Sequence, residues 1–462
     1  MGTIKRRDFI KGAAAMGSIL ILPSSAWART KGANSRLRVA VVGWGGQGLY
    51  TVKSLHAGKD SEIVALCDVD DARVANTYKK EPELFDSLRT VEKFRDYRVM
   101  LDKMGKQIDA VAVCTPDHSH YPISAWAIAM GKHVFCEKPL ARTIWETREL
   151  RRMAKEAGVY TQMGNQVHTN DAWRTIREWF DSGIMGQVED IYAWTNRDWG
   201  FDVPPPATDK IPDTLDYNLW LNVAQYQPYS NRVVPFNWRG LRNFGTGSAG
   251  DMACHFLDNP YSAFQLGAPS KIVSDALAAK DFSWPKASSI DMFFDNKYGV
   301  DGVVKLHWYD GGRKPKQIKR VDPAFLEDPK NNNCIFIVGT KHTMTFKYTG
   351  SEVRLTDRDA QIELMKAKKI PPKTIPRNRF PYNPQRDWAN ACVEGRMPES
   401  NFDYAAPFTE LALLSMISCV NPGVELRYDS ATMSFPNFPE ADKLTRSLYS
   451  YRSEFLPSAP KI

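Results

Sequence analysis

The sequence lacks the signatures of several large protein classes. None of its seven cysteines belongs to a C-x-x-C pair, no Lys/Arg-dense block occurs despite a formal net charge of +8, and no internal repeat is present. A disulfide framework and a nucleic-acid partner are therefore disfavoured. With 43% hydrophobic and 25% charged residues, the composition is that of an ordinary globular protein, long enough for two or three domains.

The N-terminal segment has the pattern of an export signal. A charged stretch, Lys5–Lys11, precedes the apolar run Gly12–Leu22 and an Ala-x-Ala site at Ala26–Ala28. The paired arginines resemble a twin-arginine signal. The apolar run is shorter than the about 20 residues that span a bilayer, so stable membrane insertion is not expected and a retained anchor is the weaker alternative. We expect residues 1–28 to direct a chain with buried, unpaired thiols to the periplasm, because such a chain folds before export in the reducing cytoplasm.

A glycine-rich turn lies between a predicted strand and a predicted helix. Residues 37–42 are apolar and β-branched, Gly43–Gly48 reads G-x-G-x-x-G, and residues 49–56 have a helical pattern. The next apolar run, 63–67, ends in Asp68, where the ribose-binding acid of a dinucleotide site is expected. The glycines allow a tight turn, close approach of a pyrophosphate, and packing of helix on strand. The predicted coenzyme-binding turn consists of Gly43, Trp44, Gly45, Gly46, Gln47 and Gly48.

Asp68 bears on which dinucleotide is bound. A carboxylate at this place accepts the ribose 2′-hydroxyl and repels a 2′-phosphate, so NAD is favoured over NADP. Arg73 lies close enough in the sequence to keep NADP as the alternative.

Strands and helices continue to alternate as far as residue 165. Further strands are predicted at 110–114, 133–136 and 159–163, and helices at 97–104, 123–130 and 144–157. This rhythm is typical of a doubly wound parallel sheet. We therefore expect an α/β protein with an N-terminal Rossmann domain over residues 29–165.

Beyond residue 165 the crossover rhythm is lost. Strand-like runs follow one another between residues 188 and 356, interrupted by a polar, Pro-rich insertion at 202–250. This pattern predicts an α+β domain over residues 166–380, with an open, mainly antiparallel sheet, for substrate binding and oligomerisation. Long insertions are usually functional or mobile. Helical patterns in 381–462 predict C-terminal helices that return to the Rossmann domain.

Lys138 closes the apolar strand 133–136 and precedes Pro139. A lysine is rarely buried unpaired, and ligands of open parallel sheets bind beyond the carboxyl ends of the strands. We therefore expect Lys138 to face a ligand, with an ion pair to Glu137 as the alternative. A cis peptide bond before Pro139 would aim the side chain.

Asp251 and His255 stand four residues apart, so on a helix they share one face. A carboxylate beside an imidazole raises its basicity, which suits a general base near neutral pH. The alternative is a helix start at which Asp251 is a cap and His255 only packs. His118 and His120 invite a metal interpretation, but no further His/Cys cluster supports it, so no metal is expected.

Together, these motifs resemble those of the Gfo/Idh/MocA family of oxidoreductases. The resemblance rests on the glycine turn, Asp68, Thr115–His120, Gly131–Val134, Glu137–Pro139, Gly164–Gln166, Asp251 and His255. Residues 217–255 are similar to a branch abundant among secreted bacterial members, but depart from it at Asn222, where glycine is expected.

The resemblance implies roles for individual residues. Lys138, Asp251 and His255 are expected to flank the nicotinamide and to be catalytic. Coenzyme contacts beyond the turn and Asp68 are expected at Thr115, Pro116, His120, Glu137, Lys138 and Asn165. Candidate substrate contacts are Lys138, Arg174, Trp194, Arg197, Trp238, Arg239 and His255.

The family's chemistry is hydride transfer between a sugar or polyol carbon and C4 of the nicotinamide. His255 is expected to take the hydroxyl proton, Asp251 to orient His255, and Lys138 to stabilise the developing alkoxide. Because free NAD is scarce outside the cytoplasm, an exported member is expected to hold NAD tightly while it oxidises a sugar or glycoside, with C3 of a hexose as one candidate position.

Two other functions stay open. The first is an NAD-dependent glycosidase, although members of that branch tend to lack the E-K-P lysine. The second is a non-catalytic carbohydrate-binding relative. In each case the exposed face of the open sheet favours a homo-oligomer, a dimer or a tetramer.

Overall fold

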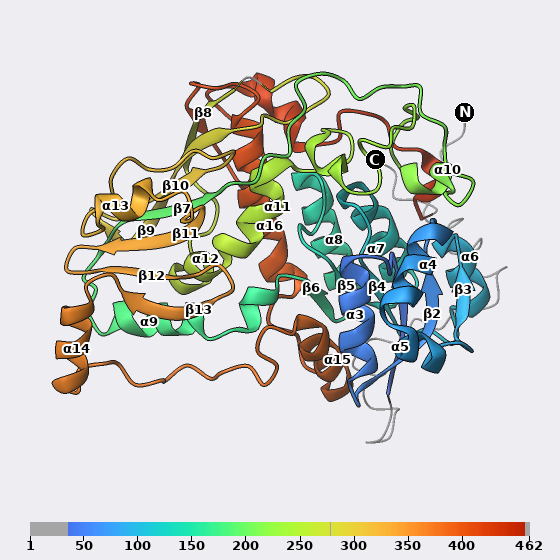
Figure 1. The fold of residues 1–462 in the computed structure, drawn as a ribbon, viewed down its shortest axis with the longest axis horizontal. Helices are drawn as coiled ribbons and strands as arrows, with labels where there is room; N and C mark the ends of the chain where they lie inside the picture. The colour runs from blue at the N-terminus through green and yellow to red at the C-terminus, as the bar shows by residue number, and fades with distance from the viewer. Residues whose placement is uncertain (1–35, 278, 458–462) are drawn as a thin grey trace.

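The computed structural model describes residues 36–277 and 279–457. Within these residues the strands form two sheets, which lie next to each other with helices packed between and around them (Figure 1). The predicted export signal, 1–28, lies outside the described residues.

The first sheet is the predicted parallel one. Its strand order in the described chain is β3-β2-β1-β4-β5-β6. The strands are Leu37–Val42 (β1), Ser61–Cys67 (β2), Glu92–Phe94 (β3), Ala110–Val113 (β4), His133–Cys136 (β5) and Thr161–Met163 (β6). The helices that connect them are Gln47–His56 (α3), Asp71–Lys80 (α4), Pro82–Ser87 (α5), Tyr97–Met104 (α6), His120–Ala129 (α7) and Ile144–Ala157 (α8). Every neighbouring pair is parallel, which confirms the Rossmann prediction.

The direction of winding reverses between β1 and β4. In open α/β sheets the ligand crevice lies beyond the carboxyl ends of the strands at such a point. The predicted glycine turn follows β1 and the E-K-P segment follows β5, so both lie at this edge of the sheet.

The second sheet is mixed. In the described residues its order is β13-β12-β11-β7-β10-β9-β8-β14. Its strands are Val188–Thr195 (β7), Lys271–Ala276 (β8), Ser288–Val300 (β9), Val303–Tyr309 (β10), Asn333–Gly339 (β11), Thr343–Lys347 (β12), Ser351–Leu355 (β13) and Leu426–Arg427 (β14). The pairs are antiparallel except β7 with β10 and a single parallel pairing of β7 with β9. The prediction of an open, mainly antiparallel sheet is confirmed.

Long helices cover one face of this second sheet. They include Ala172–Asp181 (α9), Gly247–Phe256 (α11), Asp258–Phe264 (α12) and Phe402–Ser418 (α16). α16 contacts both α8 and α11, and therefore joins the two sheets (Figure 1). The helices Pro323–Glu327 (α13) and Arg358–Lys366 (α14) lie at the outer side of the sheet (Figure 1). In the described residues, every helix is too short or too polar to cross a membrane.

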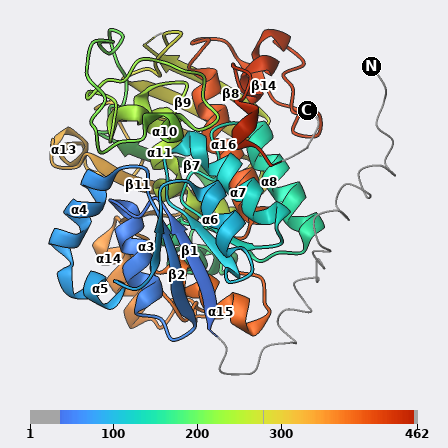
Figure 2. The same ribbon diagram turned by 90° about the vertical axis from the view of Figure 1, so that its right-hand side faces the viewer.

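Helix α15 (Pro384–Glu394) packs against the Rossmann sheet. It contacts α3, β1, β5 and β6, and the fully buried Trp388 lies with its ring centroid 5.7 Å from that of Phe135. The chain therefore comes back to its first domain after completing the second, and α15 lies below β1 in the side view (Figure 2).

The Pro-rich insertion 202–250 is a packed segment with its own apolar cluster. It contains helix α10 (Tyr217–Leu221), the 3-10 helix Asn237–Gly240 (η3) and the beginning of α11. The cluster contains Leu215, Tyr217, Trp220, Leu221, Ala224, Tyr229, Val233, Val234, Trp238, Leu241 and Phe244, with Val69 of the Rossmann domain packed against it. In both views α10 lies over the same end of the Rossmann domain (Figures 1 and 2).

Candidate active site

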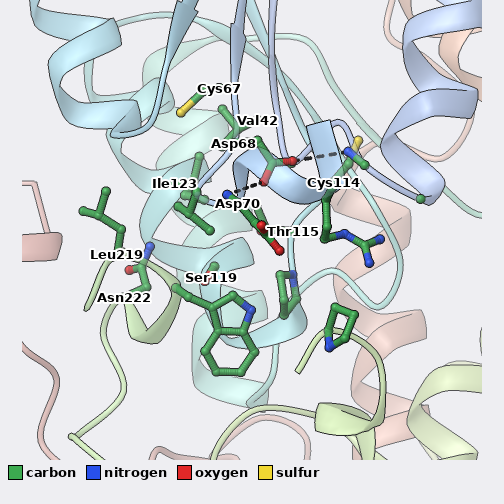
Figure 3. Close-up of a pocket in the computed structure, with 18 of the residues that line it drawn as sticks. Val42, Cys67, Asp68, Asp70, Cys114, Thr115, Ser119, Ile123, Leu219 and Asn222 are labelled. Atoms are coloured by element: carbon green, nitrogen blue, oxygen red, sulfur yellow. Dashed lines mark hydrogen bonds between the residues drawn. The ribbon is translucent and has the colours of Figure 1, made fainter. Parts of the chain in front are cut away.

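A pocket opens where the carboxyl ends of the Rossmann strands meet the insertion (Figure 3). Val42, Cys67 and Cys114 line it from the sheet, and Leu219 and Asn222 line it from the insertion. The enclosed cavity is about 210 Å³ and continues into an open mouth. The pocket lies at the edge where the sequence predicts a ligand.

The glycine turn forms one end of the pocket. Gly43 has a φ of 79°, and a Cβ on Gly48 would overlap the Gly43 carbonyl oxygen. Only glycine fits these two positions without a backbone shift. Gly45, Gly46 and Gln47 line the pocket just before α3, where backbone N–H groups and the helix dipole favour phosphate.

Asp68 follows β2 and accepts hydrogen bonds from three backbone N–H groups. Its Oδ2 lies 3.1 Å from the nitrogen of Trp44 and 3.3 Å from that of Gly45, and its Oδ1 lies 3.1 Å from that of Asp70 (Figure 3). Burial raises the pKa of the Asp68 carboxyl, while the hydrogen bonds from Asp70 and Gly45 oppose the rise. Arg73 also lines this end of the pocket.

The side chain of Trp44 does not contact the pocket. It is buried against Tyr78 and Phe85, with ring centroids 5.8 and 5.0 Å away. The indole therefore completes the core under α3, and the backbone N–H of Trp44 donates to Asp68.

Three buried side-chain atoms of the pocket have no hydrogen-bond partner in the described residues. They are Glu137 Oε2, Thr115 Oγ1 and Asn222 Oδ1. Buried polar atoms are normally paired, so unpaired ones in a pocket wall indicate a ligand that pairs with them. Thr115, Pro116 and Glu137 line the pocket, as the sequence predicts. These groups, with the glycine turn for a pyrophosphate and Asp68 for a ribose hydroxyl, fit a dinucleotide.

Lys138 lies at the end of β5 with its ammonium group beside α11. The Lys138–Pro139 peptide bond is cis, as predicted. Nζ donates to Asp251 Oδ1 at 2.8 Å and to the Asp251 carbonyl oxygen at 3.0 Å, so the ion pair is with Asp251 rather than with Glu137. An ammonium group has three N–H donors, and these two bonds leave one for a ligand.

Asp251 is the shared acceptor of three side chains, which differs from the predicted role. Its Oδ1 accepts from Lys138 and from Arg239 Nε at 3.3 Å, and its Oδ2 accepts from Trp199 Nε1 at 2.9 Å. Burial alone would raise its pKa, but Lys138 and Arg239 hold the pKa of Asp251 well below its usual range. The expectation that Asp251 orients His255 is corrected, because two cations and an indole take the carboxylate.

His255 lies one turn beyond Asp251 on α11, with part of its surface exposed. Burial, and then the charge of Lys138, lower the pKa of His255 to about 3. The imidazole is therefore neutral near pH 7 and can accept a proton. His255 lies outside the wall of the pocket itself, but close enough for the charge of Lys138 to act on its pKa.

Burial alone would lower the pKa of Lys138, but the charge of Asp251 raises it above its ordinary value. Lys138 is thus a cation that donates hydrogen bonds, and it cannot be the base. Lys138 can therefore serve as a charged hydrogen-bond donor, and His255 as a neutral proton acceptor.

His120 and Asn165 are not among the residues that line the pocket, and their contacts with a coenzyme stay predictions. The ring nitrogens of His120 lie 2.8 Å from the carbonyl oxygens of Pro139 and Thr115, so the ring links the two strand-end turns. Asn165 is fully buried and donates from Nδ2 to Asp258 Oδ1 at 2.7 Å. Both side chains position the turns that carry the pocket.

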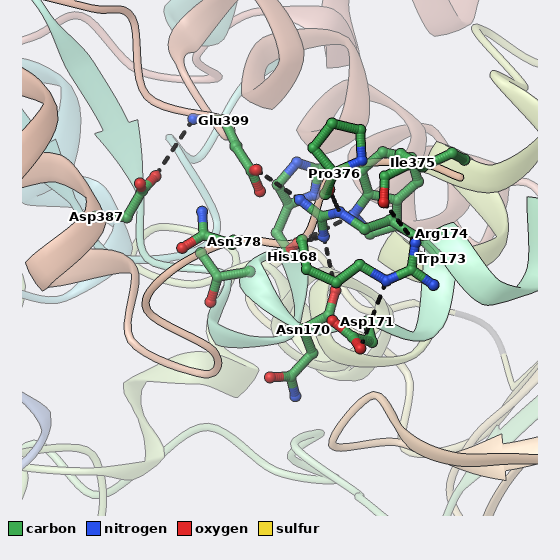
Figure 4. A network of polar contacts seen from close by, with 12 residues as sticks. His168, Asn170, Asp171, Trp173, Arg174, Ile375, Pro376, Asn378, Asp387 and Glu399 are labelled. Carbon is green, nitrogen blue, oxygen red and sulfur yellow. Dashed lines mark hydrogen bonds and ion pairs between the residues drawn. The ribbon is translucent and has the colours of Figure 1, made fainter. Parts of the chain in front are cut away.

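Two predicted substrate contacts lie elsewhere, and these predictions are wrong. Arg174 is buried on α9, where it donates to the Pro376 carbonyl oxygen at 2.7 Å and pairs with Glu399 at 2.5 Å (Figure 4). Trp194 is buried in the second sheet, stacked on Phe336 with ring centroids 5.5 Å apart. The sequence shows that a side chain is aromatic or cationic, but it does not show on which face of its helix or strand that side chain lies.

Trp238 and Arg239 line the pocket, and their contact with a substrate stays a prediction. The Arg239 guanidinium lies 4.4 Å from the Trp238 ring centroid and 5.6 Å from that of Trp199. Arg197 is exposed, and its guanidinium lies 5.6 Å from the Trp199 ring centroid. The bond from Trp199 to Asp251 was missed, because 52 residues separate them and no local pattern links them.

Asp117 is a pocket residue that the sequence singled out only as part of a motif. It is buried and accepts a hydrogen bond from Thr246 Oγ1 at 2.9 Å. Burial raises its pKa to about 7, with Arg239 opposing the rise and Asp251 adding to it. Asp117 is thus a second titratable group beside Lys138.

His118 packs between aromatic rings of the insertion. Its Nε2 lies 2.8 Å from the Trp220 carbonyl oxygen, and its ring centroid lies 5.0 Å from Trp220 and 4.9 Å from Phe244. In the part of the chain that the structure describes, no group of three or more His, Cys, Asp or Glu side chains could hold a metal ion.

Comparison with protein families agrees with this geometry. Residues 37–165 match the oxidoreductase family with an NAD-binding Rossmann fold, and residues 171–275 match the C-terminal alpha/beta domain of the same family. The two matches adjoin and together span about half of the chain. The protein belongs to the Gfo/Idh/MocA family of oxidoreductases.

Curated relatives match less than half of the chain in the two cases below. A Glycosyl hydrolase family 109 protein of Stenotrophomonas maltophilia is 28% identical over 43% of each chain. The D-glucoside 3-dehydrogenase of Escherichia coli is 30% identical over 36% of this chain and 44% of its own. The chain thus spans about half the length of the curated relatives it matches.

Solved structures share the whole fold. The aldose-aldose oxidoreductase of Caulobacter crescentus, in complex with glycerol, has a TM-score of 0.55 at 14% identity, over 85% of this chain and 100% of its own. An oxidoreductase of Agrobacterium radiobacter, in complex with NAD+, L-tartaric acid and magnesium, has a TM-score of 0.54 at 16% identity, over 85% and 98%. At these identities the likeness concerns the fold.

Proposed function

We propose that the protein is an oxidoreductase that transfers a hydride between a hydroxyl-bearing carbon of a sugar or glycoside and a tightly bound NAD. The observation that carries this proposal is that Lys138, held as a cation by Asp251, lines one pocket together with the glycine turn and Asp68, while a neutral His255 lies one turn beyond Asp251 on α11. The similarity to a D-glucoside 3-dehydrogenase supports a sugar hydroxyl, and C3 of a hexose, as the position of attack.

The glycine turn would hold the pyrophosphate, Asp68 a ribose hydroxyl, and Glu137 and Thr115 the part of the coenzyme near Lys138. NAD, when bound, supplies the acceptor of the hydride. Asp68 favours NAD over NADP, while Arg73 at the same end of the pocket is the residue that a 2′-phosphate would need.

Lys138 and His255 act on the substrate hydroxyl in this mechanism. The unused N–H of Lys138 donates to the hydroxyl oxygen and stabilises negative charge as it develops there. His255 takes the hydroxyl proton as the hydride leaves the same carbon. Asp251 keeps Lys138 charged and in place. Positioned acid–base groups of this kind contribute about 10²–10⁴-fold in rate.

Export by the twin-arginine route to the periplasm is part of the proposal. The pattern of Lys5–Lys11 and Gly12–Leu22 supports it. A chain that folds before export can take NAD with it, and the coenzyme would then be recycled by reducing a second sugar-like molecule. Replacement of both arginines of the pair with lysine is expected to retain the protein in the cytoplasm, which cell fractionation would detect.

A second candidate is an NAD-dependent glycosidase. The similarity to a Glycosyl hydrolase family 109 protein favours it. Transient oxidation by bound NAD would acidify the neighbouring C–H and allow elimination of the C1 substituent, which leaves with a proton. Water would then add at C1, and the hydride would return to the ketone. A nitrophenyl glycoside distinguishes the two candidates. A glycosidase would release nitrophenol with no net change in reduced coenzyme, whereas a dehydrogenase would oxidise the glycoside without releasing nitrophenol.

Variants at Lys138 and His255 test the proposal against a carbohydrate-binding protein without catalysis. Lys138→Ala and His255→Ala are each expected to lower kcat by about 10²-fold or more while sugar binding persists. Lys341→Ala, an exposed lysine of the second sheet, serves as the control. Unchanged function in both site variants would overturn the enzymatic proposal.

A further inference from the structure

The wall of the pocket beside Asp68 is built by the insertion 202–250. Leu215, Leu219, Trp220 and Asn222 line the same cavity as Asp68, and Figure 3 shows Leu219 and Asn222 across from Val42 and Asp68. By the logic of the Rossmann fold, the ribose-binding acid marks the adenosine half of the dinucleotide. The insertion therefore covers the half of the coenzyme that is farthest from the chemistry.

Backbone hydrogen bonds fix this wall to the loop that follows Asp68. The nitrogen of Asp71 donates to the Thr214 carbonyl oxygen at 3.0 Å, and that of Asp216 donates to the Val69 carbonyl oxygen at 2.9 Å. Arg95 donates from Nη2 to the Thr214 carbonyl oxygen at 2.8 Å. Residues from two domains thus close over one end of the pocket as a paired segment.

The insertion is also fixed on the other side of the pocket, after β4. There the backbone nitrogen of His118 donates to the Phe244 carbonyl oxygen at 3.1 Å, and its ring lies 2.8 Å from the Trp220 carbonyl oxygen. A ligand held under Leu219 and Trp220 cannot leave on that side unless these bonds open. The insertion is therefore attached on both sides of the pocket. We call these two sets of hydrogen bonds, at residues 214–216 and at His118, the latch.

Asn222 has an unfavourable backbone and an unpaired amide oxygen in this wall. Its φ is 49° and its ψ is −123°, a region that glycine enters freely and other residues do not. The residue is 2% exposed, and Oδ1 has no hydrogen-bond partner in the described residues. Backbone strain of this kind persists where the surrounding structure or a ligand compensates for it.

We infer that Asn222 is a coenzyme-binding residue, and that the insertion carrying it retains NAD between turnovers. In the bound state Oδ1 accepts a hydrogen bond from an N–H or O–H group of the adenosine half, which satisfies the buried oxygen. The inference rests on the proposed function, because it needs a dinucleotide in the pocket. It assigns retention to this segment, whereas Lys138 and His255 serve the chemistry.

The test measures release of the coenzyme and needs no turnover. The full-length protein is purified without added coenzyme and denatured, and the dinucleotide in the supernatant is quantified. The protein is then loaded with NAD and diluted into an excess of the apo form of another NAD enzyme, which captures the released NAD. The change in intrinsic tryptophan fluorescence after dilution gives the release rate. Wild type is expected to carry NAD from the purification and to release it slowly.

The decisive variant is Asn222→Gly, which removes the amide and relieves the backbone. We expect its apo form to unfold at the same temperature as wild type or higher, and its NAD release rate to rise about 10-fold, equivalent to about 1.4 kcal/mol. Asp301→Gly is the matched control, since Asp301 also has a positive φ, of 52°, but lies exposed in the β9–β10 turn. Its release rate is expected to equal that of wild type.

The outcomes separate the two proposals. Equal release rates for Asn222→Gly and wild type would overturn the role of Asn222 while leaving NAD binding intact. Arg95→Ala is the second variant, which weakens the latch without changing Asn222, and an unchanged release rate there would overturn the latch. A wild-type protein that neither contains nor binds NAD would overturn the proposed function and the inference together.

Discussion

The carboxylate of Asp251 sets the charge of the site at the scale of single residues. It accepts from Lys138, Arg239 and Trp199, and it keeps Lys138 protonated although that side chain is buried. Breaking a buried ion pair by removing one partner leaves the other charge uncompensated, which is costly. The division of roles between Lys138 and His255 therefore depends on Asp251.

Asp251→Asn is expected to lower the pKa of Lys138, because burial and the charge of Arg239 then act without the opposing carboxylate. The alkaline limb of the kcat/KM profile should move to lower pH, and kcat should fall by about 10²-fold. The measurement is the pH profile of the variant beside that of Asp403→Asn, which removes only an exposed ion pair with Arg151. An alkaline limb that stays in place would contradict the role assigned to Asp251.

Glu137 makes the stability of the protein without coenzyme depend on pH. Burial raises its pKa from 4.5 to about 7, so between these values the folded state binds more protons than the unfolded state. The free energy of unfolding therefore falls as pH rises from about 4.5 to 7, and is constant with respect to this group above 7.

Glu137→Gln is expected to remove this slope. In wild type, this group lowers the free energy of unfolding by up to roughly 3 kcal/mol between pH 4 and pH 8, which corresponds to the change in pKa. In Glu137→Gln this contribution should be absent. Urea unfolding of the two apo proteins at both pH values measures it. Equal pH dependence in the two proteins would show that the Glu137 carboxylate is not destabilised by burial.

At the scale of elements, the unit formed by β5, the E-K-P turn and α8 carries Lys138. Helix α8 begins with a capping box in which Thr143 accepts from the nitrogen of Glu146, and the Glu146 side chain accepts from the nitrogen of Thr143. This box fixes the helix immediately after the turn. The bounds of α8 agree with the predicted helix 144–157.

Thr143→Ala is expected to lower the free energy of unfolding by about 1 kcal/mol, because one helix N–H loses its acceptor. The NAD content of the purified protein should be unchanged, since the side chain points into the helix start. Thr90→Ala, at an exposed threonine, is the control for the loss of a hydroxyl. Thermal unfolding provides the comparison, and equal stability of the two variants would argue against the capping box.

Elements with a clear apolar period were predictable, and short or polar ones were not. α6 and α8 agree with their predicted bounds, 97–104 and 144–157, because their apolar spacing is regular. β3 is only three residues long, Glu92–Phe94, and α4 buries only Thr77, so neither has a pattern to read. α10 was missed since its apolar residues pack within an insertion whose prolines indicate a loop.

At the scale of the whole molecule, one face of the second sheet is not covered by α9, α11, α12 or α16 in the residues that the structure describes. On that face His307 lies 2.6 Å from Asp291 and 3.1 Å from Asp190, and its ring stacks on Tyr192. Although burial alone would lower the pKa of His307, its hydrogen bonds to the two carboxylates raise it to about 9. A charged, aromatic face of this kind suits contact with a second copy of the chain.

Light scattering of the purified protein is therefore expected to show a dimer or a tetramer. Lys305→Glu, at an exposed position on this face, should shift the distribution toward monomers, whereas Lys106→Glu in the Rossmann domain should not. A wild-type monomer at micromolar concentration would rule out this association.

Motifs within one stretch of sequence located the coenzyme half of the site, and contacts across the chain determined the rest. The glycine turn, Asp68, Glu137 and Lys138 each follow a strand, so their place at the sheet edge follows from the topology. The partners of Asp251 come from three other segments, and the helical spacing to His255 suggested the wrong one. Arg174 and Trp194 were misplaced because residue type does not indicate direction.

The most direct test of hydride transfer uses the coenzyme that the purified protein carries. The protein is mixed with a panel of monosaccharides and glycosides, and the near-ultraviolet absorbance of reduced nicotinamide is followed while the keto product is identified. We expect at least one sugar to reduce the bound coenzyme, with loss of the signal in Lys138→Ala. No reduction by any sugar, in a protein shown to contain NAD, would contradict the proposed function.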